Sequence, residues 1–242
     1  MPCPPVDPCE QANPGARAEI PRVGGGPGSA RRIQVSFLAN LEKRTLVWLA
    51  ERTPGWINSD HLTVLGFAGQ ILAGEFYALS RWNKSYLLAV IGCLAVNWLG
   101  DSLDGTLARV RQQQRARYGF YLDHMIDSFG AVIMMVGLAM SGYMHPWIAI
   151  GLLVAFLVMS IQSYLATCTL GEFRLSFWNF GPTELRLLLA VGNLALLRWP
   201  VVYGQYRLFD IAGVIGLVGM SLMLVCFTAK NGYRLYCEER IP

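Results

Sequence analysis

Six long apolar runs constrain the fold of this chain more than any other feature of its sequence. Every run except the fifth has about 18 or more residues, the length that an α-helix needs to cross the hydrocarbon core of a bilayer. Unpaired backbone groups are costly in lipid, so these runs are expected to be helical throughout. The predicted spans are 62–79, 86–107, 120–143, 147–170, 184–199 and 209–227.

Composition supports a membrane protein. Charged residues make up 15% of the 242 residues and hydrophobic residues 54%, whereas soluble domains carry about 25% charged residues. The six runs predict one all-α membrane domain at 54–236. The first 30 residues are rich in Pro, Gly, Ala and Arg and lack the apolar segment of a cleavable signal peptide. We therefore expect a disordered tail at 1–30 and a short C-terminal tail at 237–242.

The segment before the first span, 31–53, is predicted as an amphipathic helix. Its large apolar residues recur at helical spacing on one face, and Pro54 and Gly55 end the helix because both residues interrupt helices. Such a helix lies flat at the level of the lipid headgroups; packing on the helix bundle is the alternative. The apolar face consists of Phe37, Leu38, Leu41, Trp48 and Leu49.

Basic residues are distributed unevenly between the two sides of the six predicted spans. With the N-terminus inside, Arg81, Lys84, Arg198 and Arg207 lie on the outer side and the other 16 of the 20 Lys and Arg residues on the inner side. Cytoplasmic flanks carry an excess of these residues, so both termini are predicted to be cytoplasmic, in the cell membrane of a bacterium. The six cysteines form no C-x-x-C pair and indicate neither disulfides nor zinc.

Four aspartates fall within the second and third predicted spans, where carboxylates are rare and costly. Spacings of three and four residues place them on one stripe of each helix, and a short basic connection predicts that the helices are antiparallel neighbours. A divalent cation such as Mg²⁺ or Mn²⁺ would relieve the repulsion; solvated aspartates at helix ends are the alternative. The stripes contain Asp101, Asp104, Gly105 and Ala108, then Gly119, Asp123 and Asp127.

Residues around the first aspartate pair suggest a ligand. Gly105 and Ala108 leave a shallow groove on the stripe, although small residues also serve helix packing. Arg109 follows at the cytoplasmic edge, where its planar guanidinium can hold phosphate. The alternative is that Arg109 is simply one of the basic residues that flank spans on the cytoplasmic side. Asn97 lies one turn before Asp101 on the same stripe and can hydrogen-bond either a nucleotide or a neighbouring helix.

The two stripes resemble the signature of the CDP-alcohol phosphotransferase family, D-x-x-D-G-x-x-A-R, a spacer, then G-x-x-x-D-x-x-x-D. Here the signature reads DSLDGTLAR at 101–109 and GFYLDHMID at 119–127, with a spacer of nine residues where eight are usual. The family's opening P-N-x-L-T-x-x-G is similar to residues 59–66, where Thr63 matches and Ser59 and Asp60 depart.

This resemblance implies a Mg²⁺- or Mn²⁺-dependent enzyme of phospholipid biosynthesis with two metal ions. Asp101, Asp104 and Asp123 would hold metal, and Asp127 would bridge the ions or act as the base. The family also implies six spans, a juxtamembrane helix, release of CMP and frequent homodimers. Its partners are a CDP-alcohol and an acceptor alcohol, one of them a membrane lipid, and no nucleic acid. The nucleotide-binding positions would be Asp104, Gly105, Ala108, Arg109, Asn97 and Thr63.

A local likeness bears on the donor. Residues 122–128, LDHMIDS, and the pair Thr183-Glu184 resemble the choline/ethanolamine phosphotransferase branch, whose donors carry the polar alcohol and whose acceptor is diacylglycerol. His124 is then a second candidate base, aligned by Glu184. The alternative is a CDP-diacylglycerol donor with inositol phosphate, glycerol phosphate or serine as acceptor.

Two other classes of protein also place carboxylates in membrane helices. A cation channel or transporter would need polar residues through to the outer face, yet residues 87–94 and 131–140 are nearly all apolar. An intramembrane aromatic prenyltransferase pairs Asp motifs around magnesium and diphosphate, but its N-D-x-x-D-x-x-x-D spacing does not fit Asn97, Asp101 and Asp104.

Overall fold

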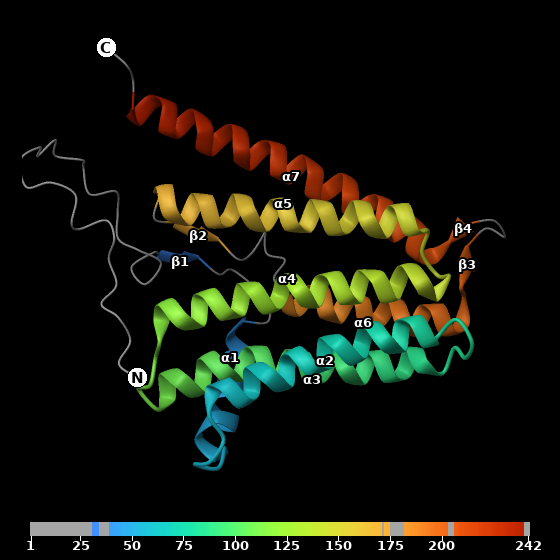
Figure 1. Ribbon diagram of the computed structural model, residues 1–242, viewed down its shortest axis with the longest axis horizontal. Helices are drawn as coiled ribbons and strands as arrows, with labels where there is room; N and C mark the ends of the chain where they lie inside the picture. Colours follow the sequence, from blue (N-terminus) through green and yellow to red (C-terminus); the bar gives the residue numbers. More distant parts are fainter. Residues whose placement is uncertain (1–30, 34–38, 171, 175–181, 203–205, 240–242) are drawn as a thin grey trace, which may run out of the picture.

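The computed structural model is helical apart from two pairs of very short strands (Figure 1). It describes residues 31–33, 39–170, 172–174, 182–202 and 206–239, so the predicted tail 1–30 lies outside the described residues. The described helices are α1 (Ala39–Arg52), α2 (Ser59–Leu79), α3 (Tyr86–Val110), α4 (Ala116–Ser141), α5 (Pro146–Leu170), α6 (Pro182–Arg198) and α7 (Leu208–Glu238), and the strands are β1 (Arg31–Ile33), β2 (Glu172–Arg174), β3 (Val201–Val202) and β4 (Tyr206–Arg207).

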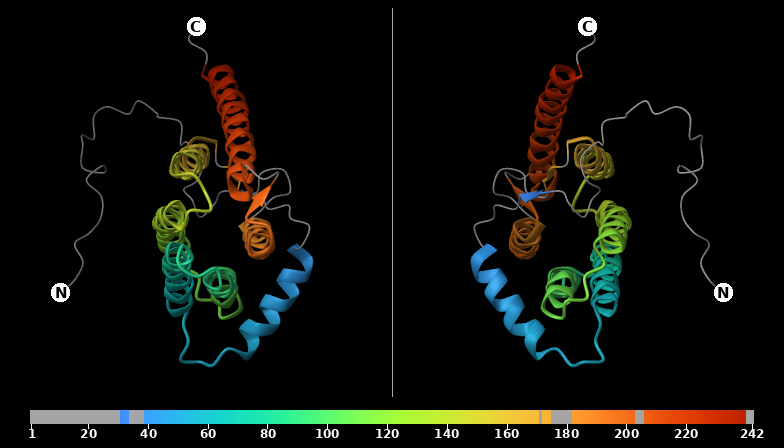
Figure 2. Two further views of the ribbon diagram at one scale, coloured as in Figure 1. Left: turned by 90° about the vertical axis from the view of Figure 1, so that its right-hand side faces the viewer. Right: turned by 90° about the vertical axis from the view of Figure 1, so that its left-hand side faces the viewer.

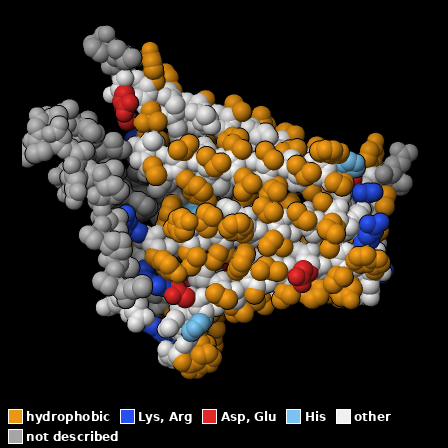
Figure 3. Space-filling model, in the orientation of Figure 1, with side chains coloured by type: hydrophobic (Ala, Val, Ile, Leu, Met, Phe, Trp, Pro, Cys, Tyr) orange, Lys and Arg blue, Asp and Glu red, His pale blue; other side chains and the backbone are white. Residues whose placement is uncertain are grey.

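Five helices, α2, α3, α4, α5 and α7, are long and apolar enough to cross a membrane. Hydrophobic side chains cover the long face of the molecule in Figure 3, and Lys and Arg side chains gather at its two ends. These features indicate an integral membrane protein. The predicted fifth span forms α6, which has 17 residues. The last span is longer than expected, since the 31 residues of α7 extend over roughly 46 Å.

The helices follow one another around the bundle in a simple order. α3 and α4 pack on α2, α5 packs on α4, α7 packs on α5, and α6 packs on α3. Figure 2, viewed along the bundle, shows these helices arranged in a ring with α6 facing α4. The C-terminal part of α7 diverges from α5 in Figure 1.

α1 lies across one end of the bundle, transverse to the long helices (Figure 2). Leu46 and Ala50 are buried against Leu62, Leu103 and Leu107 of α2 and α3, while Trp48 remains half exposed. The predicted helix 31–53 was too long, because Arg31–Ile33 pair in parallel with Glu172–Arg174 as strands β1 and β2. A strand partner 141 residues away leaves no local mark in a sequence.

The apolar core lies toward the end of the bundle opposite α1. It combines buried residues of α2, α3, α4, α5, α6 and α7, so the far halves of the spans are closed by side-chain packing. The polar stripes therefore lie near the α1 end. The core consists of Ala73, Tyr77, Leu87, Val90, Leu94, Met134, Leu138, Met144, Ala149, Leu196 and Phe209.

Glycines allow α2 to pack closely against two helices at once. A Cβ atom at Gly100 of α3 would lie 2.6 Å from the Leu62 carbonyl oxygen of α2, and a Cβ atom at Gly137 of α4 would overlap the Gly74 carbonyl oxygen. In both places the backbones themselves are in contact, so no larger residue fits without moving a helix.

This packing predicts a sharp contrast between two Gly→Ala substitutions. Gly137→Ala forces α4 away from α2 and should lower stability by about 1–3 kcal/mol, the usual effect of overpacking. Gly92→Ala is the matched control, because a Cβ there meets nothing within 4 Å and alanine favours helices by up to about 1 kcal/mol. Thermal unfolding of the detergent-solubilised protein measures both. A Gly137→Ala midpoint at or above that of Gly92→Ala would contradict the close α2–α4 contact.

Candidate active site

The two aspartate stripes meet because α3 and α4 both pack on α2. The sequence predicted that α3 and α4 are direct neighbours, and this prediction was wrong. The two helices flank α2 and make little contact with each other. The cause is the run of small residues on α2, since Gly66 lies against α3 and Gly74 against α4. The stripes therefore face one another across a space beside α2.

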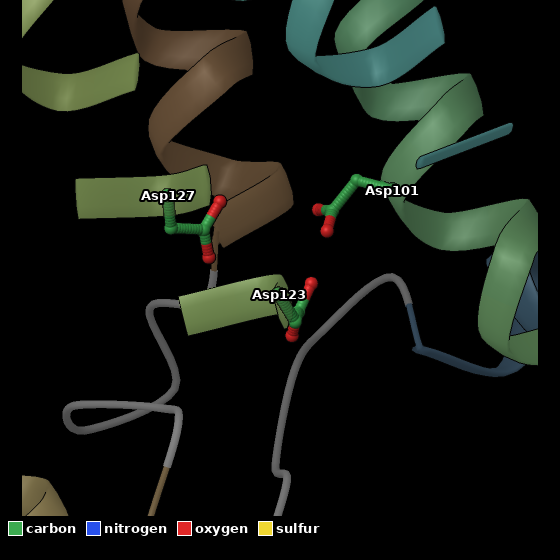
Figure 4. A group of neighbouring side chains, drawn as sticks. All are labelled: Asp101, Asp123 and Asp127. Atoms are coloured by element: carbon green, nitrogen blue, oxygen red, sulfur yellow. The ribbon is translucent and has the colours of Figure 1, made fainter. Parts of the chain in front are cut away.

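Asp101, Asp123 and Asp127 form the centre of the site. One carboxylate oxygen from each lies within 4.8 Å of the others, and all three side chains are partly buried. Figure 4 shows Asp101 reaching from α3 toward Asp123 and Asp127 of α4. Asp123 and Asp127 are four residues apart, so one helical turn places both on the same face. This cluster matches three of the four predicted metal ligands.

Arg186 of α6 binds the first of these carboxylates. Its Nη2 atom donates to Asp101 Oδ2 at 2.6 Å and its Nε atom donates to Asn97 Oδ1 at 2.7 Å. The ion pair is well shielded, with side-chain exposures of 13% for Arg186 and 25% for Asp101. A guanidinium that donates to two fixed acceptors has little freedom to turn. Arg186 therefore fixes the orientation of the Asp101 carboxylate.

Asn97 holds three helices together. It is buried, donates from Nδ2 to the Gly66 carbonyl oxygen of α2 at 3.0 Å, and accepts from Arg186 of α6. The sequence left two roles open for Asn97, a hydrogen bond to a nucleotide or one to a neighbouring helix. The structure shows hydrogen bonds to neighbouring helices.

Asp104, the fourth predicted metal ligand, lies beside the cluster of three and is held by α2. The Thr63 hydroxyl donates to Asp104 Oδ2 at 2.6 Å, and the Ser59 hydroxyl donates to the Asp104 carbonyl oxygen at 2.9 Å. The Gly105 backbone N–H also donates to the Asp104 carboxylate. Thr63, predicted to contact nucleotide, thus orients a carboxylate of the motif.

The remaining predicted nucleotide positions line the outer edge of the stripe on α3. Gly105 is exposed and a Cβ there would meet nothing within 4 Å, so the backbone is accessible at this point. Ala108 is partly buried. Arg109 donates to the Thr106 hydroxyl at 3.0 Å from the last turn of α3.

His124 lies on the side of α4 that faces α5. Its ring stacks on Phe120 at 4.2 Å and meets the edge of Tyr164 at 4.8 Å between ring centroids. Nδ1 lies 2.6 Å from the Phe120 carbonyl oxygen and 3.9 Å from Asp123 Oδ2. Because a carbonyl oxygen only accepts, Nδ1 carries a proton, so a neutral ring would have its lone pair on Nε2.

The α6 end of the site is fastened to α1 through Glu42. Glu42 Oε1 accepts from Trp98 Nε1 at 2.9 Å, from the Ser102 hydroxyl at 3.3 Å and from the Thr183 hydroxyl at 2.9 Å. Thr183 and the partly buried Glu184 lie in the first turn of α6, and Arg186 follows Thr183 by three residues. Glu42 therefore ties α1 to α3 and to the start of the helix that supplies Arg186.

The basic connection between α3 and α4 has structural contacts as well as charge. Arg111 donates to the carbonyl oxygens of Thr53, Pro54 and Ile57 and so holds the turn between α1 and α2. Arg115 pairs with Asp60, the position where the chain departs from the family's asparagine.

Arg186, Glu42 and Gln70, whose amide lies close to Asp127, were not identified from the sequence. Arg186 was counted among the cytoplasmic flanking residues, although it falls inside the predicted span 184–199. An ionisable residue inside a span usually pairs with another within the bundle, and this signal would have identified it. Glu42 carried no comparable signal because it lies on an amphipathic helix.

The donor set fits a divalent cation. Carboxylate oxygens are hard ligands of the kind that Mg²⁺ and Mn²⁺ prefer. Arg186 pairs with Asp101, and Asp123 and Asp127 bring two further carboxylates to the same point. The three carboxylates lie close enough together to bind one metal ion.

We predict that Asp123→Asn weakens Mn²⁺ binding at least about tenfold, since a neutral amide replaces a charged ligand. The paramagnetic resonance signal of free Mn²⁺, titrated against purified protein, measures this affinity. Glu75→Gln is the matched control, because it removes one exposed carboxylate from the far end of α2. An Asp123→Asn affinity equal to that of the control would rule out the cluster as the cation site.

The comparison with known families agrees with this geometry. A family model described as CDP-alcohol phosphatidyltransferase matches residues 56–226, which include α2 to α6, most of α7 and all four aspartates of the motif. No curated protein matches the chain significantly. Because the family match covers more than two thirds of the sequence, the chain belongs to the CDP-alcohol phosphatidyltransferase family.

Proposed function

We propose that this protein transfers a substituted phosphate group from a CDP-alcohol to a second alcohol and releases CMP, as a step of phospholipid synthesis. The observation that carries the proposal is the meeting of Asp101, Asp123 and Asp127, three residues of the family motif, within 4.8 Å on two helices.

The reaction exchanges one phosphorus–oxygen bond for another. The acceptor oxygen bonds to the phosphorus that carries the donor alcohol, the bond from this phosphorus to the bridging oxygen breaks, and CMP leaves with that oxygen. Bound divalent cations would offset the charge of the diphosphate and of the departing CMP. We propose two such ions, Mg²⁺ or Mn²⁺, held by Asp101, Asp104, Asp123 and Asp127.

Residues around the aspartates would orient the substrate. Gly105 and Ala108 would admit the nucleotide to the surface of α3, and the accessible backbone at Gly105 supports this placement. Arg109 would contact a phosphate at the edge of the site. Asn97 and Thr63 act through Arg186 and Asp104, which they hydrogen-bond.

The acceptor hydroxyl must lose a proton, and Asp127 is our first candidate for the base. Asp127 belongs to the cluster and would therefore lie beside the reacting phosphate. His124 is the second candidate, with Glu184 aligning it, and the lone pair on Nε2 favours this role. Its position between Phe120 and Tyr164, on the α5 side of α4, favours Asp127 instead.

We assign the donor as CDP-ethanolamine or CDP-choline and the acceptor as a diacylglycerol-like lipid. The support is the likeness of LDHMIDS and Thr183-Glu184 to the choline/ethanolamine branch. Thr183 also hydrogen-bonds Glu42, which accepts from Ser102, the residue after Asp101. A CDP-diacylglycerol donor with inositol phosphate, glycerol phosphate or serine as acceptor is the second candidate.

The membrane arrangement is part of the same proposal. Residues 54–236 form a six-span domain with α6 as the fifth span, α1 lies at the membrane surface, and both termini face the cytoplasm of a bacterial cell. The transverse orientation of α1 supports its surface position (Figure 2). Assembly as a homodimer rests on the family alone.

The test is CMP release by the purified protein with Mg²⁺ and each of three donors, CDP-ethanolamine, CDP-choline and CDP-diacylglycerol. Each donor is paired with diacylglycerol and with the polar acceptors. We expect CMP from the first two donors with diacylglycerol and none after chelation of the metal. Asp127→Asn should lower the rate about 10²-fold or more, the usual contribution of a positioned base, while Glu75→Gln retains it.

Other outcomes of this assay each remove one part of the proposal. CMP from CDP-diacylglycerol alone reverses the donor assignment. A loss in His124→Ala as large as that in Asp127→Asn moves the base to His124. No CMP from any donor, together with cation flux in proteoliposomes, favours a channel or transporter and contradicts the enzymatic proposal.

A further inference from the structure

Gln70 occupies an unusual position for an amide side chain. It lies in the middle of α2, is 7% exposed, and belongs to the segment that packs between α3 and α4. Its amide lies close enough to the Asp127 carboxylate to interact with it. Because a carboxylate accepts, the Gln70 amide nitrogen is the atom that can donate to Asp127.

Gly130 of α4 provides the space for this side chain. Gly130 follows Asp127 by three residues and so lies on the same face of α4. A Cβ atom there would overlap the Gln70 amide oxygen and carbon and would lie 2.8 Å from its nitrogen. The Gln70 amide therefore rests directly on the α4 backbone, and a residue larger than glycine at 130 would displace it.

Within the part of the chain that the structure describes, the oxygen of the Gln70 amide lacks the hydrogen bond that a buried acceptor normally makes. Gln70 Oε1 is buried and has no hydrogen-bond partner among the described residues. An unmet buried acceptor costs about 1–3 kcal/mol, so an apolar residue of similar length would serve packing better. The presence of an amide is explained by its nitrogen, which can donate to a nearby carboxylate of the cluster, that of Asp127.

We infer that Gln70 is the positioning residue for Asp127 and that Gly130 is required to seat it. By holding one oxygen of Asp127, Gln70 directs the other toward Asp101 and Asp123. Asp101 is held in the same way by Arg186, and Asp104 by Thr63. The inference rests on the proposed role of this cluster in binding the cation.

The test is a double-mutant cycle on the full-length protein in detergent. Gln70→Met keeps the length of the side chain but removes the donor, and Gln70→Ala empties the space above Gly130. Gly130→Ala displaces Gln70 without altering it. Gly92→Ala is the matched control, because a Cβ at 92 meets nothing within 4 Å.

We expect Gln70→Met and Gly130→Ala each to weaken Mn²⁺ binding by about 10–100-fold, the usual effect of losing a partner of a metal ligand. The melting temperature of Gln70→Met should equal or exceed that of the wild type, because the unmet acceptor is gone. Gly130→Ala should add no further loss of Mn²⁺ affinity in the Gln70→Ala background, since no side chain remains to be displaced.

Wild-type Mn²⁺ affinity in Gln70→Met would overturn the inference, and so would additive losses in the double variant. Gln70→Met decides the matter even if Gly130→Ala fails to fold. Failure of the proposed function looks different: the wild type would bind Mn²⁺ and Gln70→Met would weaken it, yet no CDP-alcohol would yield CMP.

Discussion

Asp101, Asp123 and Asp127 carry like charges, and their oxygens lie within 4.8 Å of one another inside a bundle of apolar helices. Carboxylates at such separations repel, and the repulsion grows as water is excluded. The chain meets this constraint in two ways. Arg186 neutralises part of the charge, and a divalent cation bound by the carboxylates would neutralise more. The α1 end of the bundle is built around this group, while the opposite end is closed by apolar packing.

α2 is the helix that brings the aspartates of α3 and α4 together. Its backbone touches α3 near Gly100 and α4 near Gly137, so the two aspartate helices are set at a fixed separation on either side of it. The same helix supplies Thr63 to Asp104 and Gln70 to Asp127. A helix without acidic ligands in the cluster thus determines both the distance between the carboxylates and their orientation.

The spans and the aspartate stripes were predictable because both are local properties of a helix. Apolar length marks α2, α3, α4, α5 and α7, and spacings of three and four residues place Asp101 with Asp104 and Asp123 with Asp127. Contacts between distant segments could not be predicted in this way. Nothing near Gln70 indicates that its amide reaches α4, and the pairing of β1 with β2 joins segments 141 residues apart. The role of Arg186 was partly predictable, because an arginine within an apolar span usually pairs with another residue inside the bundle.

If the cluster is the cation site, Asp101, Asp123 and Asp127 bind the cation as one group. An experimental structure with Mn²⁺, in which anomalous scattering locates the metal, tests this directly. We expect an anomalous peak between α3 and α4 with oxygens of all three aspartates at bonding distance. A Mn²⁺-bound structure with its anomalous peaks elsewhere, and with Asp101 still paired only to Arg186, would contradict it.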